Sequence, residues 1–168
     1  PLREARDFAF DPADLEARIT PRTRLLILNS PHNPTGGILG SSALEDIAAI
    51  LRRHPGVWIY ADEIYSRLVY EGAFVSIASL PGMVERTIIS DGASKTWAMT
   101  GWRIGFASNP VLAPQFVRWV TNTDSCATQI SQWAVVEAIQ GPQDAAEAMR
   151  RSFLERRDLI VGLLNRVP

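Results

Sequence analysis

Cysteine is almost absent from this sequence. Its scarcity limits both the cellular compartment that we expect and the kinds of covalent or metal site that the chain can form. Cys126 is the only cysteine in 168 residues, so the chain can form neither an internal disulfide nor a cysteine-based metal cluster. Proteins of the reducing cytoplasm rarely need disulfides. We therefore expect a cytoplasmic protein.

The sequence also lacks an excess of charge and a long apolar run. Its 17 basic and 18 acidic residues leave a formal net charge of −1, which favours neither nucleic acid nor an anionic membrane surface as a partner. No apolar stretch approaches the roughly 20 residues that a membrane-spanning helix needs. Internal repeats and low-complexity linkers are absent as well. We expect no nucleic acid and no membrane among the partners, and one domain with its own core.

The two ends of the chain are unusual. It begins with Pro1 rather than methionine, and it stops at Pro168 directly after a strong helical pattern. A helix that runs to the last residues suggests that the next element is missing. We expect a fragment of a longer protein, with a processed or tagged chain as the alternative.

Four short apolar runs predict strands. The first two are bounded by turn residues and are apolar almost throughout, which is typical of strands buried on both faces of a sheet. The four runs are Arg24–Ser30, Gly56–Asp62, Arg86–Asp91 and Trp102–Asn109.

Helical patterns alternate with these runs and then follow them. Asp11–Ile19 has Asp11 as its expected N-cap and Pro12 at the first helical position. Ser42 and Glu45 match a capping box at the start of a second helix. Its expected buried stripe is Leu44, Ile47, Ala48 and Leu51.

Three more helices are expected toward the C-terminus. One follows Asn109-Pro110, one covers about Ala127–Gln140, and a long one follows Gly141-Pro142. Apolar residues in the long helix are spaced for a single buried stripe. They are Ala145, Met149, Phe153, Ile160 and Leu164.

The alternation of strands and helices predicts an α/β fold, with three layers and a mostly parallel sheet flanked by helices. In such sheets, ligands bind beyond the carboxyl ends of the strands. Asn33, Asp62 and Lys95 follow three of the predicted strands, so we expect them at that edge.

Asp62 closes an apolar strand, where an unpaired carboxylate would be costly to bury. It needs a positive partner or several hydrogen bonds. The alternative is that Asp62 caps the turn that follows it, which the sequence "DEIY" would allow.

Asn33 and Tyr65 have ordinary explanations when each is considered alone. Asn33 lies in "HNPTG", where an asparagine before proline commonly makes a turn. Tyr65 follows Asp62 by three residues and would suit a half-buried aromatic with a locally satisfied hydroxyl.

Lys95 and Arg103 lie in "DGASKTWAMTGWRIGF", with no carboxylate between them. Small neighbours let a ligand approach the backbone near Lys95, and a lysine amine can form a Schiff base with a carbonyl. Arg103 suits a phosphate or carboxylate in a desolvated place. The alternatives are a solvated loop lysine and an arginine on an exposed strand edge.

Together these five residues are more specific than any one of them. They supply a carboxylate for a ring nitrogen, a lysine for a Schiff base, an arginine for a phosphate, and an amide and a phenol for a ring oxygen. This combination describes a pyridoxal phosphate site.

Three stretches carry a family resemblance: "NSPHNPTGG", "YADEIYSRLVYEG" and "SDGASKTWAMTGWRIGF". They resemble the successive signatures of the class I/II aminotransferases, the aspartate-aminotransferase-like enzymes of pyridoxal phosphate fold type I. The resemblance spans nearly the whole chain. It implies that Lys95 holds the cofactor as a Schiff base and that Arg103 binds its phosphate. It also implies that Asp62 pairs with the ring nitrogen, and that Asn33 and Tyr65 bind the phenolic oxygen.

The sequence departs from the family pattern in two ways. Gly92 occupies the position of a phosphate-binding serine, with Ser94 or Ser90 as the substitute. The family's Gly-rich phosphate loop, its ring-stacking aromatic residue and its arginine for the substrate α-carboxylate have no counterpart here. The resemblance therefore assigns residues 1–140 to part of the large cofactor domain, and residues 141–168 to a long helix leading toward a small domain. We expect these 168 residues alone to be inactive.

The resemblance implies an aminotransferase that moves an amino group between an amino acid and a 2-oxo acid. Lys95, Asp62 and Tyr65 would be its catalytic residues, and the protein would be a homodimer. Two alternatives stay open. One is a carbon–sulfur lyase on the same fold, and the other is an aminotransferase-like domain of a transcription regulator.

Overall fold

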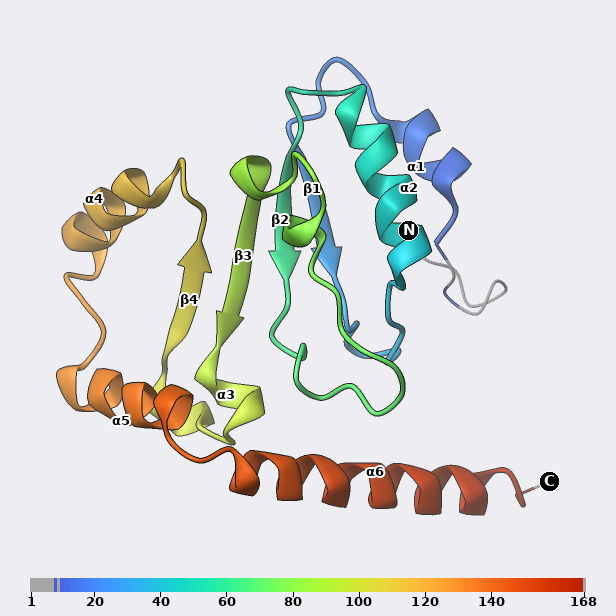
Figure 1. The fold of residues 1–168 in the computed structure, drawn as a ribbon, viewed down its shortest axis with the longest axis vertical. Coiled ribbons are helices and arrows are strands. Elements are labelled where there is room, and N and C mark those ends of the chain that lie inside the picture. Colours follow the sequence, from blue (N-terminus) through green and yellow to red (C-terminus); the bar gives the residue numbers. More distant parts are fainter. Residues whose placement is uncertain (1–7, 9, 168) are drawn as a thin grey trace.

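A computed structural model of the chain describes residue 8 and residues 10–167; Pro1 and Pro168 lie outside this part (Figure 1). The described residues form one four-stranded sheet in the order β1-β2-β3-β4. The first three strands are parallel, and β4 is antiparallel to β3. The expected α/β class, a mostly parallel sheet flanked by helices, is confirmed. The strands are β1 (Leu25–Asn29), β2 (Trp58–Asp62), β3 (Thr87–Gly92) and β4 (Gly105–Ser108).

The main core lies between the sheet and helix α2 (Ser41–Arg52). The register sets Ile59 of β2 beside Leu26 and Thr87, so these three side chains share one face of the sheet. The predicted stripe of α2 is buried against this face, together with Ile59 and Ala61. Helix α1 (Pro12–Arg18) lies alongside α2 (Figure 1).

One predicted helix cap is confirmed, and the other is wrong. The Asp11 carboxylate accepts the backbone N–H groups of Ala13 and Asp14 at the start of α1. Helix α2 begins two residues earlier than the capping-box pattern predicts. Gly40 is its N-cap, and no side chain caps it. A cap depends on the backbone angles ahead of the helix, which the Ser42–Glu45 spacing does not reveal.

The burial of β1 on both faces, which its apolar run predicts, is not observed. Leu26 and Leu28 pack against the core under α2. Leu25 and Ile27 point to the other face and remain 46% and 67% exposed. No described element covers them.

Beyond β3 the chain forms a smaller second core. Helix α3 (Ala93–Thr96) follows β3 directly, and the turn η4 (Thr100–Trp102) precedes β4. Ala93, Met99 and Ile104 pack there against Val135 of helix α5. The remaining helices are α4 (Ala113–Thr123) and α5 (Gln129–Gln140), and the other short turns are η2 (Ile77–Ser79) and η3 (Val84–Arg86).

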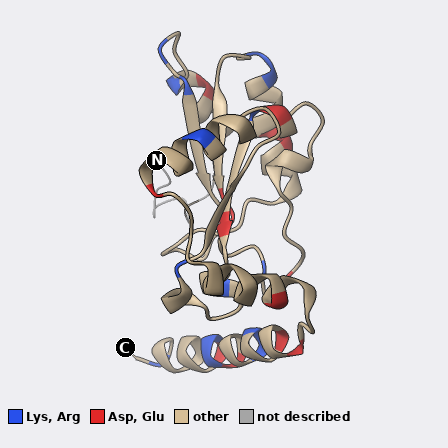
Figure 2. Ribbon diagram, turned by 90° about the vertical axis from the view of Figure 1, so that its left-hand side faces the viewer, with Lys and Arg blue, Asp and Glu red and all other residues tan. Residues whose placement is uncertain are grey.

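Helix α6 (Asp144–Leu164) runs past the carboxyl ends of β1, β2 and β3 (Figure 1). Acidic and basic residues alternate along it (Figure 2). The prediction that its apolar stripe is buried is wrong for the described chain. No α6 residue is buried, and Phe153, Ile160 and Leu164 are 45%, 56% and 60% exposed. None of the helices in the described part is both long and apolar enough to span a bilayer.

Candidate active site

A cavity of about 1290 Å³ opens beyond the carboxyl ends of the strands, between α3 and α6. A second hollow of about 340 Å³ adjoins it, because Ser94, Lys95 and Thr100 line both. Asn33 and Tyr65 line the large cavity, whereas Arg103 lines the small one. The opposite wall of the large cavity comes from α6 and includes Met149, Ser152, Phe153 and Arg156.

Lys95 lies on α3, which follows β3 without a loop. This short connection fixes its amine close to the sheet edge. The Nζ atom is 5.7 Å from the centre of the Tyr65 ring. No carboxylate of the described residues forms an ion pair with Lys95, and its side chain borders both hollows. Lys95 is also the only lysine in the chain.

Asn33 and Tyr65 meet although 32 positions separate them in the sequence. The Asn33 Nδ2 group donates a hydrogen bond of 3.2 Å to the Tyr65 hydroxyl. The two turns that follow β1 and β2 therefore present an amide and a phenol to the same point of the cavity. This arrangement is what two groups serving one ligand oxygen require.

Sequence reasoning missed Asn29, which orders the first of these turns. Its Oδ1 atom accepts the Asn33 N–H at 3.1 Å. Asn29 is the last residue of β1 and is paired in register with Asp62. Its polar side chain at the end of an apolar strand was the signal that could have identified it.

Asp62 ends β2 and is half-buried. Its Oδ1 atom accepts the backbone N–H of Ile64 at 3.3 Å, so the turn-capping contact considered from the sequence is present. Asp62 lies at the same sheet edge as Asn33 and Lys95, but it does not line the cavity that they share. No lysine or arginine of the described part pairs with its carboxylate.

Arg103 lies outside β4, and the prediction that it falls within a strand is wrong. It ends η4 in the left-handed conformation, with φ 55° and ψ 44°. The turn over Thr100–Trp102 delays the strand to Gly105. The Arg103 Nη1 group donates to the Thr100 carbonyl at 2.9 Å. No acidic side chain of the described residues pairs with this guanidinium, which borders the small hollow beside Lys95.

Ser94 is better placed than Ser90 to supply the phosphate-binding hydroxyl that Gly92 lacks. A Cβ atom on Gly92 would lie 2.8 Å from the carbonyl oxygen of Ile104, so a serine does not fit there without movement. Ser94 borders both hollows. Ser90 borders neither.

Two further carboxyl groups lie close to Asp62, and sequence reasoning missed both. Burial raises the pKa of the Glu63 carboxyl group, and the Asp91 carboxylate acts in the same direction. The hydrogen bond that the Ser76 hydroxyl donates to Glu63 lowers this pKa. Burial also raises the pKa of Asp91. The Gly92 N–H and the Arg67 guanidinium act in the opposite direction on the Asp91 carboxyl, while Asp62 raises its pKa. Their position next to Asp62 and at the end of β3 was the available signal.

Comparisons with known proteins agree with this geometry. The family description "Aminotransferase class I and II" matches residues 1–167. An aspartate/prephenate aminotransferase of Cereibacter sphaeroides is 42% identical over 164 residues, covering 94% of this chain and 40% of that protein. An arginine–pyruvate transaminase of Pseudomonas aeruginosa is 38% identical over 172 residues, covering 100% and 43%.

A solved structure gives the same result for the fold. The aromatic aminotransferase from Pyrococcus horikoshii OT3 superposes with a TM-score of 0.92 at 38% identity, over 98% of this chain and 45% of that one. The chain thus spans less than half the length of these relatives. With a family match over nearly all of its residues, the chain belongs to the class I and II aminotransferases.

Proposed function

We propose that the whole protein is a pyridoxal-phosphate-dependent aminotransferase that moves an amino group between an amino acid and a 2-oxo acid. One observation carries the proposal. Lys95 lies over the Tyr65 ring of the Asn33–Tyr65 pair in a large cavity, and Arg103 borders the adjoining hollow. Neither side chain has an ion-pair partner among the described residues. The names of the relatives, which are aminotransferases of several amino acids, support the same reaction. They do not favour a carbon–sulfur lyase or a regulator.

The residues present fit this cofactor. Arg103 has no carboxylate partner among the described residues, and Ser94 lies beside it on the lining of the small hollow. A guanidinium with a hydroxyl group beside it is a suitable donor set for a phosphate. The Asn33 amide and the Tyr65 hydroxyl, which touch each other, would bind the phenolic oxygen of the ring.

Bound pyridoxal phosphate would supply an aldehyde and a ring that accepts the electrons of a deprotonated amino acid. Lys95 would hold the aldehyde carbon through its amine. The same amine would also serve as the base that takes the proton from the substrate Cα and returns it where the amino transfer requires it.

Asp62 would keep the ring nitrogen protonated, because an adjacent carboxylate favours the charged form of that nitrogen. Its bond to the Ile64 N–H orients one carboxylate oxygen and leaves the other oxygen for this role. In this proposal the turn-capping contact and the catalytic role of Asp62 are compatible.

The proposed domain organisation and assembly follow from the same resemblance to the aminotransferases. We infer that residues 1–140 form part of the large cofactor domain of fold type I, and that residues 141–168 lead toward a small domain. We also infer a cytoplasmic homodimer, whose small-molecule partners are an amino acid and a 2-oxo acid.

The test is Lys95→Ala in the whole protein, with Arg118→Ala as the control on an exposed arginine of α4. After loading with pyridoxal phosphate and reduction with borohydride, peptide mass spectrometry should find the cofactor attached at Lys95 in the parent and in the control. In Lys95→Ala the attachment should vanish, and transamination should fall by about three orders of magnitude or more. A variant that keeps a reducible bond in this peptide, or keeps its activity, contradicts the proposal.

A further inference from the structure

The corner between α5 and α6 is organised by the side-chain amide of Gln143. Its Oε1 atom accepts the indole N–H of Trp97 at 3.0 Å and the Nη1–H of Arg67 at 3.3 Å. Its Nε2 group donates to the carbonyl oxygens of Ala138 and Gly141 at 2.9 and 2.8 Å. One amide therefore joins three segments that are distant in the sequence.

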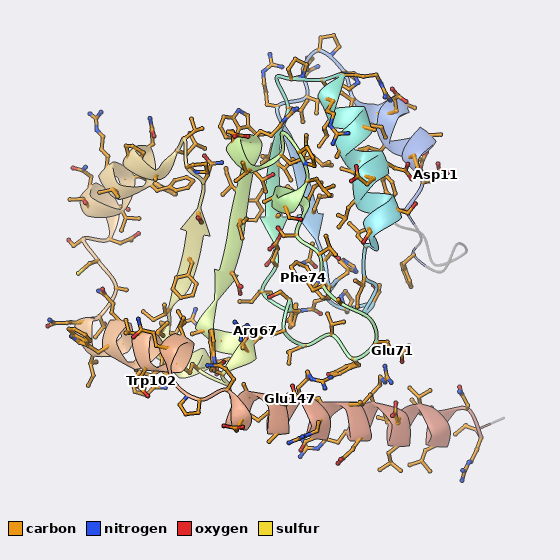
Figure 3. All side chains as sticks on the ribbon, viewed as in Figure 1. Asp11, Arg67, Glu71, Phe74, Trp102 and Glu147 are labelled. Carbon is orange, nitrogen blue, oxygen red and sulfur yellow. The ribbon has the colours of Figure 1, made fainter. Side chains whose placement is uncertain are left out.

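Two of these partners lie two residues away from the candidate reactive groups. Trp97 ends α3, which carries Lys95, and its backbone N–H donates to the Ala93 carbonyl at 3.3 Å. Arg67 lies two residues after Tyr65. Figure 3 shows Arg67 beside α3, above the start of α6.

Trp97 and Arg67 also contact each other. The guanidinium carbon of Arg67 is 5.5 Å from the centre of the Trp97 ring. The ring itself packs against the second core. A half-buried indole N–H normally needs an acceptor, and Gln143 provides it. Loss of that acceptor would leave the indole N–H of Trp97 without its partner and would remove one contact of Arg67.

We propose that Gln143 is a positioning residue that fixes the Lys95 and Tyr65 segments relative to each other through Trp97 and Arg67. The start of α6 becomes part of the same rigid unit, since Gln143 is also the N-cap of that helix. The inference rests on the proposed function in one respect, namely that Lys95 and Tyr65 are the reactive pair. The competing explanation is local: Gln143 would only close the α5–α6 corner through the Ala138 and Gly141 carbonyls.

Hydrogen–deuterium exchange of the cofactor-free whole protein separates these explanations, because it does not depend on activity. We expect Gln143→Ala to speed amide exchange about tenfold in residues 93–98 and 64–68 as well as in the corner at 138–144. The matched control is Gln140→Ala, an exposed glutamine three residues earlier, whose side chain makes no hydrogen bond within the described chain. It should leave all three segments unchanged. Faster exchange in Gln143→Ala that is confined to residues 138–144 would overturn the proposal.

Trp97→Phe provides a second route, which also covers the case in which Gln143→Ala fails to fold. It keeps an aromatic ring in the second core and removes the indole donor, together with part of the ring volume. Exchange in residues 93–98 should rise in the same direction as in Gln143→Ala. In residues 93–98 the double variant should add little to either single change, because both remove the same Trp97–Gln143 hydrogen bond. Unchanged exchange in Trp97→Phe, or fully additive effects, would count against Gln143 as the link.

Kinetics of the loaded protein complete the test. A positioning role should lower kcat about tenfold in Gln143→Ala and leave KM within about twofold, because reactive-group geometry rather than substrate binding is disturbed. A normal kcat together with faster exchange in residues 93–98 would refute the positioning role. If the parent protein itself shows no transamination, the proposed function fails, and the exchange pattern alone decides whether Gln143 orders the two segments.

Discussion

At the scale of single residues, Gly92 shows how a missing methyl group keeps the lysine-bearing helix close to its neighbouring strand. A Cβ atom there would meet the Ile104 carbonyl oxygen at 2.8 Å and the Gly105 Cα at 3.2 Å. The same Ile104 oxygen accepts the N–H of Ala93, the first residue of α3.

We therefore expect Gly92→Ala to destabilise the protein by about 1–3 kcal/mol, because backbone atoms rather than a flexible side chain would have to move. Gly101→Ala is the control, since nothing lies within 4 Å of a Cβ atom at that position. Urea unfolding of both variants measures the difference. Equal midpoints for the two would show that β4 moves aside at little cost.

Glu63 leads to a prediction about pH. Burial raises its pKa in the folded protein, so the native state keeps a proton at a pH where the unfolded chain has lost it. Stability from this group is therefore present at low pH and is lost as the pH rises through the raised pKa. Asp91, whose pKa burial also raises, contributes in the same direction.

Glu63→Gln keeps a polar group for the Ser76 hydroxyl, which lies 2.6 Å from the Glu63 carboxylate, but it cannot ionise. We expect the free energy of unfolding of the variant to gain on the parent as the pH rises from about 4 to about 8. Urea titrations across that range are the measurement. Parallel pH profiles for parent and variant would mean that Glu63 ionises in the folded protein without cost.

Whether sequence reasoning could find a residue depended on what fixes the position of that residue in the fold. The strand-end rule predicted that Asn33, Asp62 and Lys95 lie at one edge of the sheet, and Asn33 and Lys95 line one cavity there, whereas Asp62 does not. Tyr65 was selected by its motif and not by this rule. Arg103 could be selected by its motif but not placed, since its left-handed backbone is set by a turn rather than by its own preference. Gln143 could not be found at all, because its partners lie 46 and 76 positions away.

At the scale of elements, the C-terminal end of α2 depends on one arginine. Arg86, at the end of η3, donates to the carbonyl oxygens of Leu51 and His54, at 2.8 and 2.6 Å, and to that of Val57. Leu51 lies in the last turn of the helix, where carbonyls lack partners further along the helix, and His54 and Val57 follow it. Burial lowers the pKa of the Arg86 guanidinium.

Arg86→Met should leave these three carbonyls without this donor and should destabilise the protein by about 2 kcal/mol or more. Arg118→Met, on an exposed face of α4, is the matched control and should change little. Thermal or urea unfolding decides between them. An equally small change in both variants would mean that water replaces the guanidinium without cost.

The buried face of a helix followed from the local sequence pattern where the described sheet covers that face. The apolar stripe of α2 packs directly on the sheet, so the helical spacing of its apolar residues correctly predicted which of them are buried. The stripe of α6 has the same spacing, yet its residues remain exposed in the described chain. A period shows which face of a helix is apolar, and only the rest of the structure shows whether that face is covered.

At the scale of the whole molecule, polar contacts hold much of α6 against the rest of the chain. Arg150 donates to the Val69 carbonyl at 3.2 Å, and Arg157 pairs with Glu71 at 3.1 Å. Figure 3 places Glu71 just above this helix. Exposed ion pairs are weak and are screened by salt. At the start of α6, Gln143 adds hydrogen bonds to Arg67 and Trp97, which are not ion pairs.

The last prediction concerns these 168 residues as an isolated chain. Large apolar side chains remain exposed on β1, α4 and α5: Ile27 is 67% exposed, Trp119 68%, Ile130 69% and Trp133 66%. Exposed apolar surface favours association, and the chain spans only about 40% of the length of its relatives. We expect the isolated chain to self-associate, to bind pyridoxal phosphate weakly and to catalyse no transamination.

Three measurements test these properties: sedimentation velocity at several concentrations, an absorbance titration with the cofactor, and an assay over several amino-acid and oxo-acid pairs. Trp133→Lys should reduce the association, while Arg118→Lys, on the neighbouring helix, should not. A monomer that binds cofactor tightly and turns over would show that these residues already hold a complete site.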